Sequence, residues 1–406
     1  MKPNCATNLK APNQVSYLEL LCLLAAGIGI YVGTTVSAVA QTLPLPAARV
    51  IHVGQLASKT NPLTSAMAGE YIAGIELAFS RINAQGGIKG RPVLLITKDD
   101  NFDAGKAVAL TEQMVAQEDI LAMVGNFGTQ PLLKLATEGI LEKHLLASIA
   151  PMTGLRSALN KPNIFPLRAS YEDEVLAMFN HAKSVQHSKV VYLYFEAGVG
   201  THLAKLAPEM ASQSRINLSA LAGFAVTADK SLQESAVTNA LKTFGADRPD
   251  AVVLIAVGGV HSEAVKALRK HYGSSMPIYS LGQVSSSTLI KDVGNKAAAG
   301  VMLTQVVPEP AKAMLPVMRE FHADLRKLSD ATVPGYMLLE GYLAGRVTAE
   351  VVKRSTALTR EAILKRAQNI GEIDLGGYRV VYNLNERKSL HPVELTMISQ
   401  TGRLIR

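Results

Sequence analysis

Apolar and polar positions follow two periods along residues 48–406. Short apolar runs such as Val190–Phe195 have the length and β-branched content of buried strands. The segment Tyr71–Asn83 instead repeats apolar residues at i, i+3, i+4 and i+7, as an amphipathic helix does. Because the two kinds of segment alternate almost throughout, the pattern predicts α/β lobes built on parallel sheets.

The strands predicted from the apolar runs are Arg49–Leu56, Val93–Thr97, Ile120–Val124, Leu145–Ala150, Val190–Phe195, Ala220–Val226, Ala251–Val257, Ile278–Leu281, Val301–Val307, Tyr378–Tyr382 and Val393–Ser399. The predicted helices are Tyr71–Asn83, Ala104–Gln117, one from Pro131 onward, Glu172–Ser184, Thr201–Ser212, Leu232–Phe244, Ser262–Tyr272, Ala313–Leu328, Tyr336–Lys353 and Arg360–Gln368. Together these elements predict two lobes and a closing region of helices and strands. No pattern repeats every 20–50 residues or so, which excludes solenoid and propeller architectures.

The segment Ile120–Leu141 is the first candidate for a binding site. A buried strand, Ile120–Val124, precedes a helix in which Pro131 is expected at the first helical position, where proline is favoured. The Thr129 hydroxyl and the free amides of the first helical turn would then point at the carboxyl end of the strand. Small ligands bind at that end of an open parallel sheet. An ordinary capped helix would have the same sequence pattern, so the rest of the chain must decide.

The first forty residues have the features of an export signal. Lys2 and Lys10 precede the apolar stretch Leu18–Val39, which ends in the small-x-small pattern Ala38-Val39-Ala40. We expect residues 1–40 to be a signal peptide that is cleaved before Gln41. A retained membrane anchor is the alternative, because the stretch is long enough to span a bilayer.

Cysteine content and charge limit the chemistry of the exported chain. Both cysteines, Cys5 and Cys22, lie in the predicted leader, so thiol catalysis, cysteine metal sites and disulfides are excluded from the remainder. The formal net charge of +8 comes from residues scattered along the chain and not from a basic run. This distribution indicates a solvated basic surface and no nucleic-acid partner.

Known catalytic and cofactor motifs are absent from the sequence. No G-x-G-x-x-G follows the first strand, and the chain has no P-loop, no G-x-S-x-G and no H-E-x-x-H. Asp99, Asn101, Asp103 and Gly105 reproduce the start of a calcium loop, but its twelfth position is Leu110 in place of a bidentate glutamate. We interpret these acids as strand-end and helix-capping residues. The sequence therefore predicts no enzyme activity, no metal and no cofactor.

Several segments across residues 48–406 carry a family resemblance. They are Ala73–Phe79, Ile82–Arg91, Lys98–Asp100 with Asp103, Ala150–Gly154, Leu167–Glu174, Thr304–Pro308 and Leu339–Tyr342. With these segments the chain resembles the type I periplasmic solute-binding proteins of the leucine/isoleucine/valine-binding family, which are receptors for ABC transporters.

The resemblance implies two Rossmann-like lobes with parallel sheets, joined by three crossovers, with a ligand cleft between them. The first lobe would comprise residues 48–169 plus 305–373, and the second 170–304 plus 374–406. Such a protein is a periplasmic monomer without enzymatic activity. It closes at its hinge around a small molecule and then docks on a permease in the inner membrane.

The resemblance also implies which first-lobe residues bind the ligand. The strand-end hydroxyl that holds the ligand carboxylate falls on Thr129, in agreement with the argument from the helix amides. Contacts from the next strand-end loop fall on Met152, Thr153 and Gly154.

Further wall positions of the site fall on residues from three other segments. Tyr336 would form an apolar or aromatic wall, and Met67 occupies the position of an aromatic residue near the first helix. Tyr171, beside the first crossover, is expected to reach the cleft.

The second lobe departs from the amino-acid-binding pattern. Two aromatic positions that flank the ligand fall on Val199 and Val260, and the acid that pairs with the ligand ammonium falls near Gln283. An unpaired ammonium in a desolvated cleft is costly, so amino-acid binding is doubtful unless another acid substitutes. Glu196 and Glu263 are the candidates for that substitution.

The family's loop disulfide is also missing, because its two positions are Phe102 and Gly128. Phe127 or Phe102 is expected to pack there, with extension of an apolar pocket as the alternative. The departures together predict a carboxylate or amide with an apolar body as the ligand.

Three other functions are compatible with parts of this pattern. The same two lobes could report ligand occupancy to a membrane signalling protein, since hinge closure serves both purposes. An enzyme that uses the cleft would need a nucleophile or an acid pair near Thr129. A cell-envelope protein that has lost ligand binding would show no ligand-dependent change in melting temperature.

Overall fold

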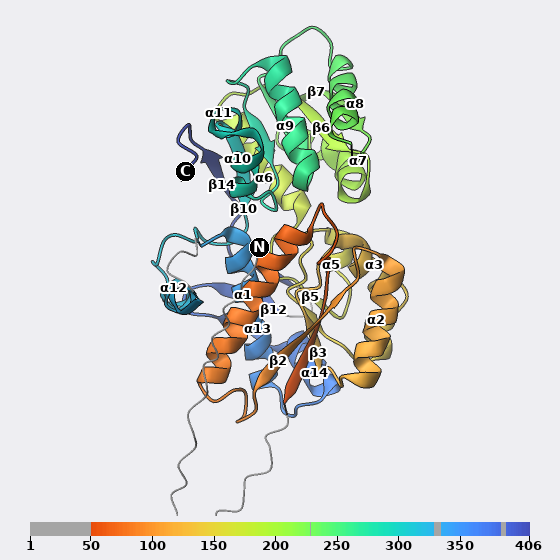
Figure 1. The fold of residues 1–406 in the computed structure, drawn as a ribbon, viewed down its shortest axis with the longest axis vertical. Helices are drawn as coiled ribbons and strands as arrows, with labels where there is room; N and C mark the ends of the chain where they lie inside the picture. The colour runs from red at the N-terminus through yellow and green to blue at the C-terminus, as the bar shows by residue number, and fades with distance from the viewer. Residues whose placement is uncertain (1–49, 228, 329–333, 383–386) are drawn as a thin grey trace, which may run out of the picture. The chain divides into compact units, whose positions relative to one another are not determined.

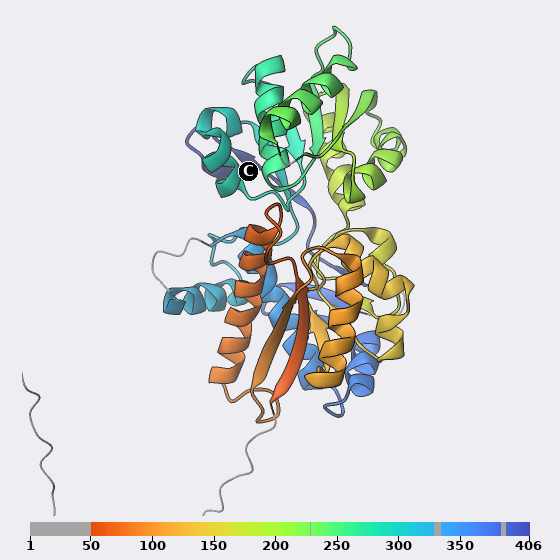
Figure 2. The same ribbon diagram turned by 45° about the vertical axis from the view of Figure 1, so that its right-hand side comes forward.

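The computed structural model describes residues 50–227, 229–328, 334–382 and 387–406. The predicted signal peptide, residues 1–40, lies outside this range. Within the described residues the chain forms two α/β lobes (Figure 1), seen after a 45° turn in Figure 2. This confirms the fold class expected from the alternation of strands and helices.

In the described part of the first lobe, five parallel strands pair in the order β2-β1-β3-β4-β5. Their bounds are β1 Ile51–Ala57, β2 Val93–Asp99, β3 Ala122–Val124, β4 Ser148–Ile149 and β5 Ile164–Phe165. The helices of this lobe are α1 Ser65–Ala84, α2 Ala104–Gln117, α3 Thr129–Thr137, α4 Ile140–Lys143, α5 Arg156–Leu159, α12 Pro316–Leu328, α13 Tyr336–Arg354 and α14 Arg360–Asn369. Helices α1 and α13 cover one face of the sheet and α2 and α3 the other.

Glycines allow α1 and α13 to pack backbone against backbone. A Cβ atom at Gly74 of α1 would lie 2.1 Å from the carbonyl oxygen of Leu338. At Gly341 of α13 it would lie 2.1 Å from the carbonyl oxygen of Tyr71. The phenol of Tyr71 is buried and donates a hydrogen bond to the Ala150 carbonyl at 2.8 Å, which ties α1 to the end of β4.

The second lobe holds a mixed sheet whose described strands pair in the order β15-β14-β10-β9-β8-β6-β7. Their bounds are β6 Lys189–Phe195, β7 Asn217–Phe224, β8 Ala251–Ile255, β9 Ile278–Ser280, β10 Val301–Gln305, β14 Glu394–Ile398 and β15 Leu404–Ile405. Strands β6 to β10 are parallel, whereas β14 and β15 are antiparallel additions at one edge. The helices are α6 Tyr171–Ser184, α7 Gly198–Gln213, α8 Lys230–Lys242, α9 Gly258–Tyr272, α10 Ser286–Val293 and α11 Asn295–Ala298.

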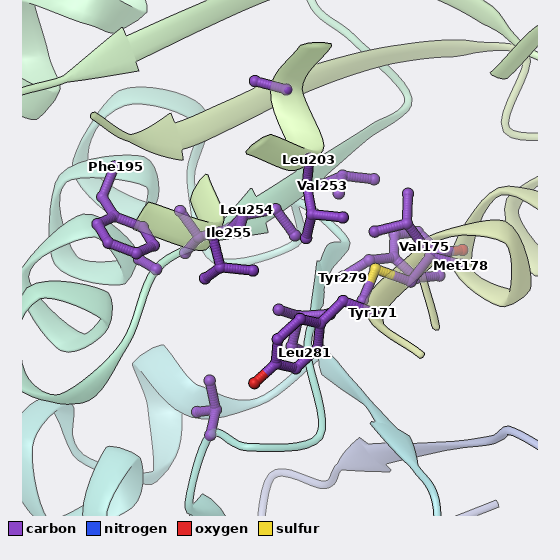
Figure 3. Packing of buried hydrophobic residues seen from close by; sticks show 14 of the residues in the cluster. Tyr171, Val175, Met178, Phe195, Leu203, Val253, Leu254, Ile255, Tyr279 and Leu281 are labelled. Carbon is purple, nitrogen blue, oxygen red and sulfur yellow. The ribbon is translucent and has the colours of Figure 1, made fainter. Parts of the chain in front are cut away.

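Helix α6 packs its apolar face into the core of the second lobe. Tyr171, Val175 and Met178 of α6 belong to the same buried cluster as residues of the central strand β8 (Figure 3). Ser170 caps this helix, and its side chain and that of Asp173 each accept a hydrogen bond from the other's backbone N–H. The cap fixes where the chain leaves the first lobe, and it therefore also fixes the position of Tyr171.

The last return to the second lobe occurs later than the resemblance implied. Strands β11 Gly371–Asp374, β12 Arg379–Tyr382 and β13 Arg387–Ser389 form a small antiparallel sheet. Tyr382 is buried in the first-lobe core and donates a hydrogen bond to the Phe165 carbonyl at 3.0 Å. The chain thus crosses between β13 and β14, instead of directly after residue 373, because the apolar side chains of β12 complete the first-lobe core.

Helix α3 also begins earlier than its sequence indicates. Gly128 stands before the first helical residue with φ 108°, a conformation open to glycine, and Thr129 is already helical. Pro131 is therefore the third helical residue and not the first. Its missing N–H is still one of those that the first turn leaves without a helical acceptor.

Candidate functional site

A cavity of about 300 Å³ lies between the two lobes. Its first-lobe lining residues are Asn61, Leu63, Thr64, Met67, Phe102, Phe127, Gly128, Thr129, Gln130 and Met152. Its second-lobe lining residues are Tyr171, Phe195, Ala197, Gly198, Val199, Val226, Val257, Val260 and Gln283. Among these residues of the described chain none is charged.

The parallel strands explain why these residues meet. The cavity residues follow the carboxyl ends of β1, β2, β3 and β4 in the first lobe and of β6, β7, β8 and β9 in the second. All carboxyl ends of parallel strands lie at one edge of a sheet, where the connecting loops are free to vary. The two sheets present these edges to each other across the cavity.

Thr129 and Thr153 form a hydroxyl pair on the first-lobe side. Their Oγ1 atoms are 2.7 Å apart, and the backbone N–H of Leu155 donates to Thr153 Oγ1 at 3.3 Å. Thr129 lines the cavity, whereas Thr153 is fully buried behind it. Thr153 therefore orients the Thr129 hydroxyl and does not itself line the cavity.

Tyr171 and Gln283 form the corresponding polar pair on the second-lobe side. The Tyr171 hydroxyl donates to Gln283 Oε1 at 3.0 Å, and the Tyr171 N–H donates to the Gly154 carbonyl at 2.7 Å. Burial raises the pKa of Tyr171, which keeps the phenol protonated as a donor, although the nearby Arg168 opposes this shift. Gly154 lies under the tyrosine ring, because a Cβ there would be 2.6 Å from Tyr171 Cδ1. Gly154 thus supports the site and is not part of its lining.

The second-lobe wall is apolar where an amino-acid site would need charge. Val199 and Val260 line the cavity together with Phe195. Glu196 is exposed, and Glu263 is paired with Lys266 at 2.9 Å on α9. Neither acid is among the lining residues, so neither replaces the missing carboxylate.

Phe102 and Phe127 pack in the first-lobe core at or next to the two positions, Phe102 and Gly128, at which the resemblance implies a disulfide, and both side chains also line the cavity. A Cβ at Gly128 would lie 2.6 Å from Phe102 Cε2, so the phenylalanine ring occupies the space next to this glycine. The two alternatives considered for these side chains, packing and pocket extension, are both realised. The rings add apolar surface on the first-lobe side.

Helices α3, α7 and α9 begin at the cavity. The residues that precede these helices in the described chain, Gly128, Ala197 and Val257, make no side-chain hydrogen bond to the first helical turn. The backbone N–H groups of a first helical turn and the helix dipole favour a negative charge nearby and disfavour a positive one. The electrostatics of the cavity therefore suit an anion, although no cationic side chain lines it.

A buried ion network lies beside the cavity at the first crossover. Arg168 is 1% exposed, contacts Glu174 of α6 at 2.9 Å and Glu340 of α13 at 3.6 Å, and lies 5.3 Å from the centre of the Tyr171 ring. Burial alone would lower the pKa of Arg168, but Glu340 and Glu174 together raise it. Since α6 belongs to the second lobe and α13 to the first, this arginine connects the lobes at the hinge.

Three of the predicted site residues are not among the lining residues: Thr153 and Gly154 lie behind the lining, and Tyr336 lies at the start of α13. Tyr336 is near Glu309, Glu394 and Arg406, and burial raises the pKa of its phenol. The remaining positions, Thr129, Met152, Tyr171, Gln283, Met67, Val199 and Val260, are brought together around the cavity.

Several lining residues that follow strands were not among the predicted site positions. Asn61, Leu63 and Thr64 lie in the loop after β1, and Val226 and Val257 follow β7 and β8. The rule that located Thr129, a loop after the carboxyl end of a parallel strand, would have indicated these loops too. It does not say which side chain in a loop faces inward.

The acids of the calcium-like loop have structural partners. Asp103 caps α2 by accepting a hydrogen bond from the Lys106 N–H at 2.8 Å, as expected from the sequence. In the part of the chain that the structure describes, no group of three metal-ligating side chains comes together. Nor does any helix there combine the length and apolarity needed to cross a bilayer.

Known proteins are similar to this chain over the whole of both lobes. A family described as periplasmic binding protein matches residues 50–403. A Leu/Ile/Val-binding protein homolog from Brucella abortus is 22% identical, over 89% of this chain and 92% of its own. An extracellular ligand-binding receptor from Verminephrobacter eiseniae has a TM-score of 0.80 at 25% identity, covering 88% of this chain and 100% of that chain. A branched-chain amino acid transporter substrate-binding protein from Streptococcus pneumoniae, solved with isoleucine, has a TM-score of 0.74 at 17% identity, over 88% of this chain and 98% of its own.

Proposed function

The chain belongs to the periplasmic binding protein family, and from this premise we propose that it is the solute receptor of an ABC transporter for an apolar carboxylate or amide. The family consists of binding proteins, so the chain is a binder and not an enzyme. In this proposal the protein is exported by its leader, acts in the periplasm as a monomer and delivers its solute to an inner-membrane permease.

The lining of the cavity is the observation that supports this proposal most strongly. Among the described residues around it, apolar side chains predominate, no carboxylate is present, and the starts of α3, α7 and α9 point to it. An α-amino acid would bring an ammonium into this space with no acid to pair with it, at a cost of several kcal/mol. A carboxylate or amide oxygen instead meets the hydroxyl of Thr129 and free backbone N–H groups.

The lobes also contact each other beside the cavity, as closure requires. A Cβ atom at Gly258, the first residue of α9, would lie 2.4 Å from the carbonyl oxygen of Leu63 in the first lobe. A solute that bridges the lobes favours this closed arrangement by its differential affinity for it. The permease then recognises the closed form.

A thermal-shift screen of the exported protein tests the proposal. The screen compares branched-chain amino acids with aromatic and aliphatic acids and their amides at 1 mM. A ligand at a hundred times its Kd adds about 2.7 kcal/mol to the free energy of unfolding, which raises Tm by several degrees. We expect this response from apolar acids or amides. A strong response to leucine, isoleucine or valine with none to the apolar acids and amides would overturn the proposal.

Co-purification tests the partner. Permease subunits recovered from detergent-solubilised membranes with the ligand-bound protein would support transport. Recovery of a membrane kinase or chemoreceptor instead would assign the protein to signalling.

A further inference from the structure

The Gln283 side chain carries a donor that the fold leaves without an acceptor. Gln283 follows β9, lines the cavity and is 6% exposed. Its Oε1 accepts from the Tyr171 hydroxyl, but its Nε2 has no hydrogen-bond partner in the described part of the chain. A buried N–H group without an acceptor is costly, and a bound molecule that supplies the acceptor removes that cost.

The surroundings of Tyr171 fix the orientation of this amide. The Tyr171 hydroxyl has a single proton and donates it to Gln283 Oε1, so this oxygen of the amide is the one that faces the tyrosine. The Gly154 carbonyl holds the Tyr171 backbone by accepting a hydrogen bond from its N–H, and the Arg168 guanidinium lies over the ring. The amide oxygen of Gln283 is occupied by Tyr171, and its NH₂ group stays unpaired in a residue that lines the cavity.

Two separate hydrogen-bonded pairs lie at the cavity, one on each lobe. They are Thr129 with Thr153 and Tyr171 with Gln283, and Thr129 and Gln283 both line the cavity. A solute that contacts both Thr129 and Gln283 must offer polar atoms to the first lobe and the second at once.

We propose that Gln283 Nε2 donates to an acceptor oxygen of the solute and thereby selects against an ammonium group at that place. The solute class is an apolar acid in which a second carboxylate oxygen, or a 2-oxo oxygen, faces Gln283. An ammonium group carries only hydrogen-bond donors. It could not accept from the amide N–H, and its own protons would find no acceptor there. The inference rests on the proposed function, since it refines which atoms the apolar acid presents.

Calorimetric titration with two matched probe sets tests this assignment. One set is 4-methyl-2-oxopentanoate, 4-methylpentanoate and L-leucine; the other is phenylpyruvate, 3-phenylpropanoate and L-phenylalanine. Within a set the apolar body is constant and the group beside the carboxylate changes. We expect the wild type to bind the oxo and unsubstituted acids at least 100-fold more tightly than the amino acid.

Two substitutions separate the effect of the Gln283 amide group on binding from the effect of the shape of its side chain. Gln283→Leu removes the donor, and we expect at least tenfold weaker binding of the acids. Gln283→Glu keeps an oxygen for Tyr171 but replaces the NH₂ group with a carboxylate oxygen, so the acids should weaken further and the amino acids should gain affinity. The control is Gln213→Leu, the same substitution at an exposed end of α7 in the same lobe, with no expected change. Melting temperatures identify a variant that fails to fold.

The possible results lead to different conclusions. Tight binding of the acids by the wild type, with the same affinities in Gln283→Leu and Gln283→Glu, would overturn the inference and leave the proposed function intact. Failure of every acid probe to bind the wild type would contradict the proposed function, and the inference with it. A loss of acid binding in both variants together with a gain of amino-acid binding in Gln283→Glu supports both.

Discussion

Thr129 and Gln283 face the cavity from opposite lobes, and each is a polar group among apolar neighbours. Thr129 was identified from the sequence because it follows a buried strand and precedes a helix. Gln283 was identified because the resemblance implies an acid near this position, where the chain has a neutral amide. The contacts of these residues, through Thr153 and Tyr171, could not be read from the sequence, since they join segments far apart in the chain.

Replacement of Thr129 by valine removes the hydroxyl and keeps the side-chain shape. We expect the affinity for the best apolar acid to fall roughly 10- to 100-fold, since a hydrogen bond to a charged group contributes about 1.5–3 kcal/mol. The measurement is calorimetric titration. Thr137→Val, at the other end of α3 and exposed, is the matched control and should bind as the wild type does. Equal affinity in both variants would remove Thr129 from the site.

Asp99 and Asp100 are neighbours with opposite shifts of pKa. Burial raises the pKa of Asp100 from 3.8 to about 6, and its Oδ2 has no hydrogen-bond partner among the described residues. Burial acts in the same direction on Asp99, but hydrogen bonds from Thr60, Asn101 and Lys59 outweigh it and lower the pKa. The two carboxyl groups therefore have opposite effects on the pH dependence of stability.

Asparagine substitutions should reveal this difference in urea unfolding at pH 4 and pH 7. The raised pKa of Asp100 means that the folded wild type loses stability as pH rises from about 4 to about 6. Asp100→Asn removes that loss, so the variant should gain about 2 kcal/mol relative to wild type between the two pH values. Asp99→Asn should show no comparable change between these pH values, since the lowered pKa of Asp99 places its titration below pH 4. The same pH trend in both variants would contradict the assignment.

At the scale of elements, the spacing of apolar residues predicted the bounds of a helix or strand well where that element buries a regular face. Helix α2 has the predicted bounds, and α13 differs by one residue at its end. The two-residue strands β4 and β5 and the short helices α10 and α11 were missed or misjudged in length, because they have too few residues to establish a period. The start of α3 depended on the positive φ of Gly128, which the sequence pattern did not reveal.

The start of α9 offers a test of closure that replaces no lining residue. Gly258→Ala places a methyl group 2.4 Å from the Leu63 carbonyl oxygen, so the lobes must separate slightly. We expect at least tenfold weaker binding of the best apolar acid in calorimetry, with a loss of about 1–2 kcal/mol of stability from the positive φ of 52°.

Two controls distinguish closure from backbone strain. Gly259→Ala is adjacent and has open space, while Gly139→Ala has a positive φ of 65° but no atom within 4 Å of the new methyl group. Both should bind as the wild type does. If Gly139→Ala weakened binding as much as Gly258→Ala, the effect would come from strain in the fold and not from the contact between lobes.

At the scale of the whole molecule, the chain passes between the lobes near Arg168. The two-lobed architecture could be predicted from the resemblance, but the position of the last crossover could not. It depends on whether the apolar residues of β12 complete the core of one lobe or the other, and the apolar pattern of a strand does not show which. The arginine that joins α6 to α13 likewise gave no signal, since its acids are 6 and 172 residues away in the chain.

Loss of the Arg168 charge should destabilise the molecule strongly. Arg168→Met leaves Glu174 and Glu340 buried without a cation, and we expect the free energy of unfolding at pH 7 to fall by about 3–5 kcal/mol. Arg156→Met removes a half-exposed ion pair with Asp173 and should cost at most about 1 kcal/mol. Urea denaturation measures both. A similar small loss in the two variants would show that the hinge network contributes little.

Native mass spectrometry of the protein purified from the periplasm tests the central claim most directly, because a tightly closed receptor retains its solute. We expect one small molecule per chain, an apolar acid or amide without an amino group, and its loss in Thr129→Val but not in Thr137→Val. A retained α-amino acid, or a solute held equally by Thr129→Val, would contradict the account.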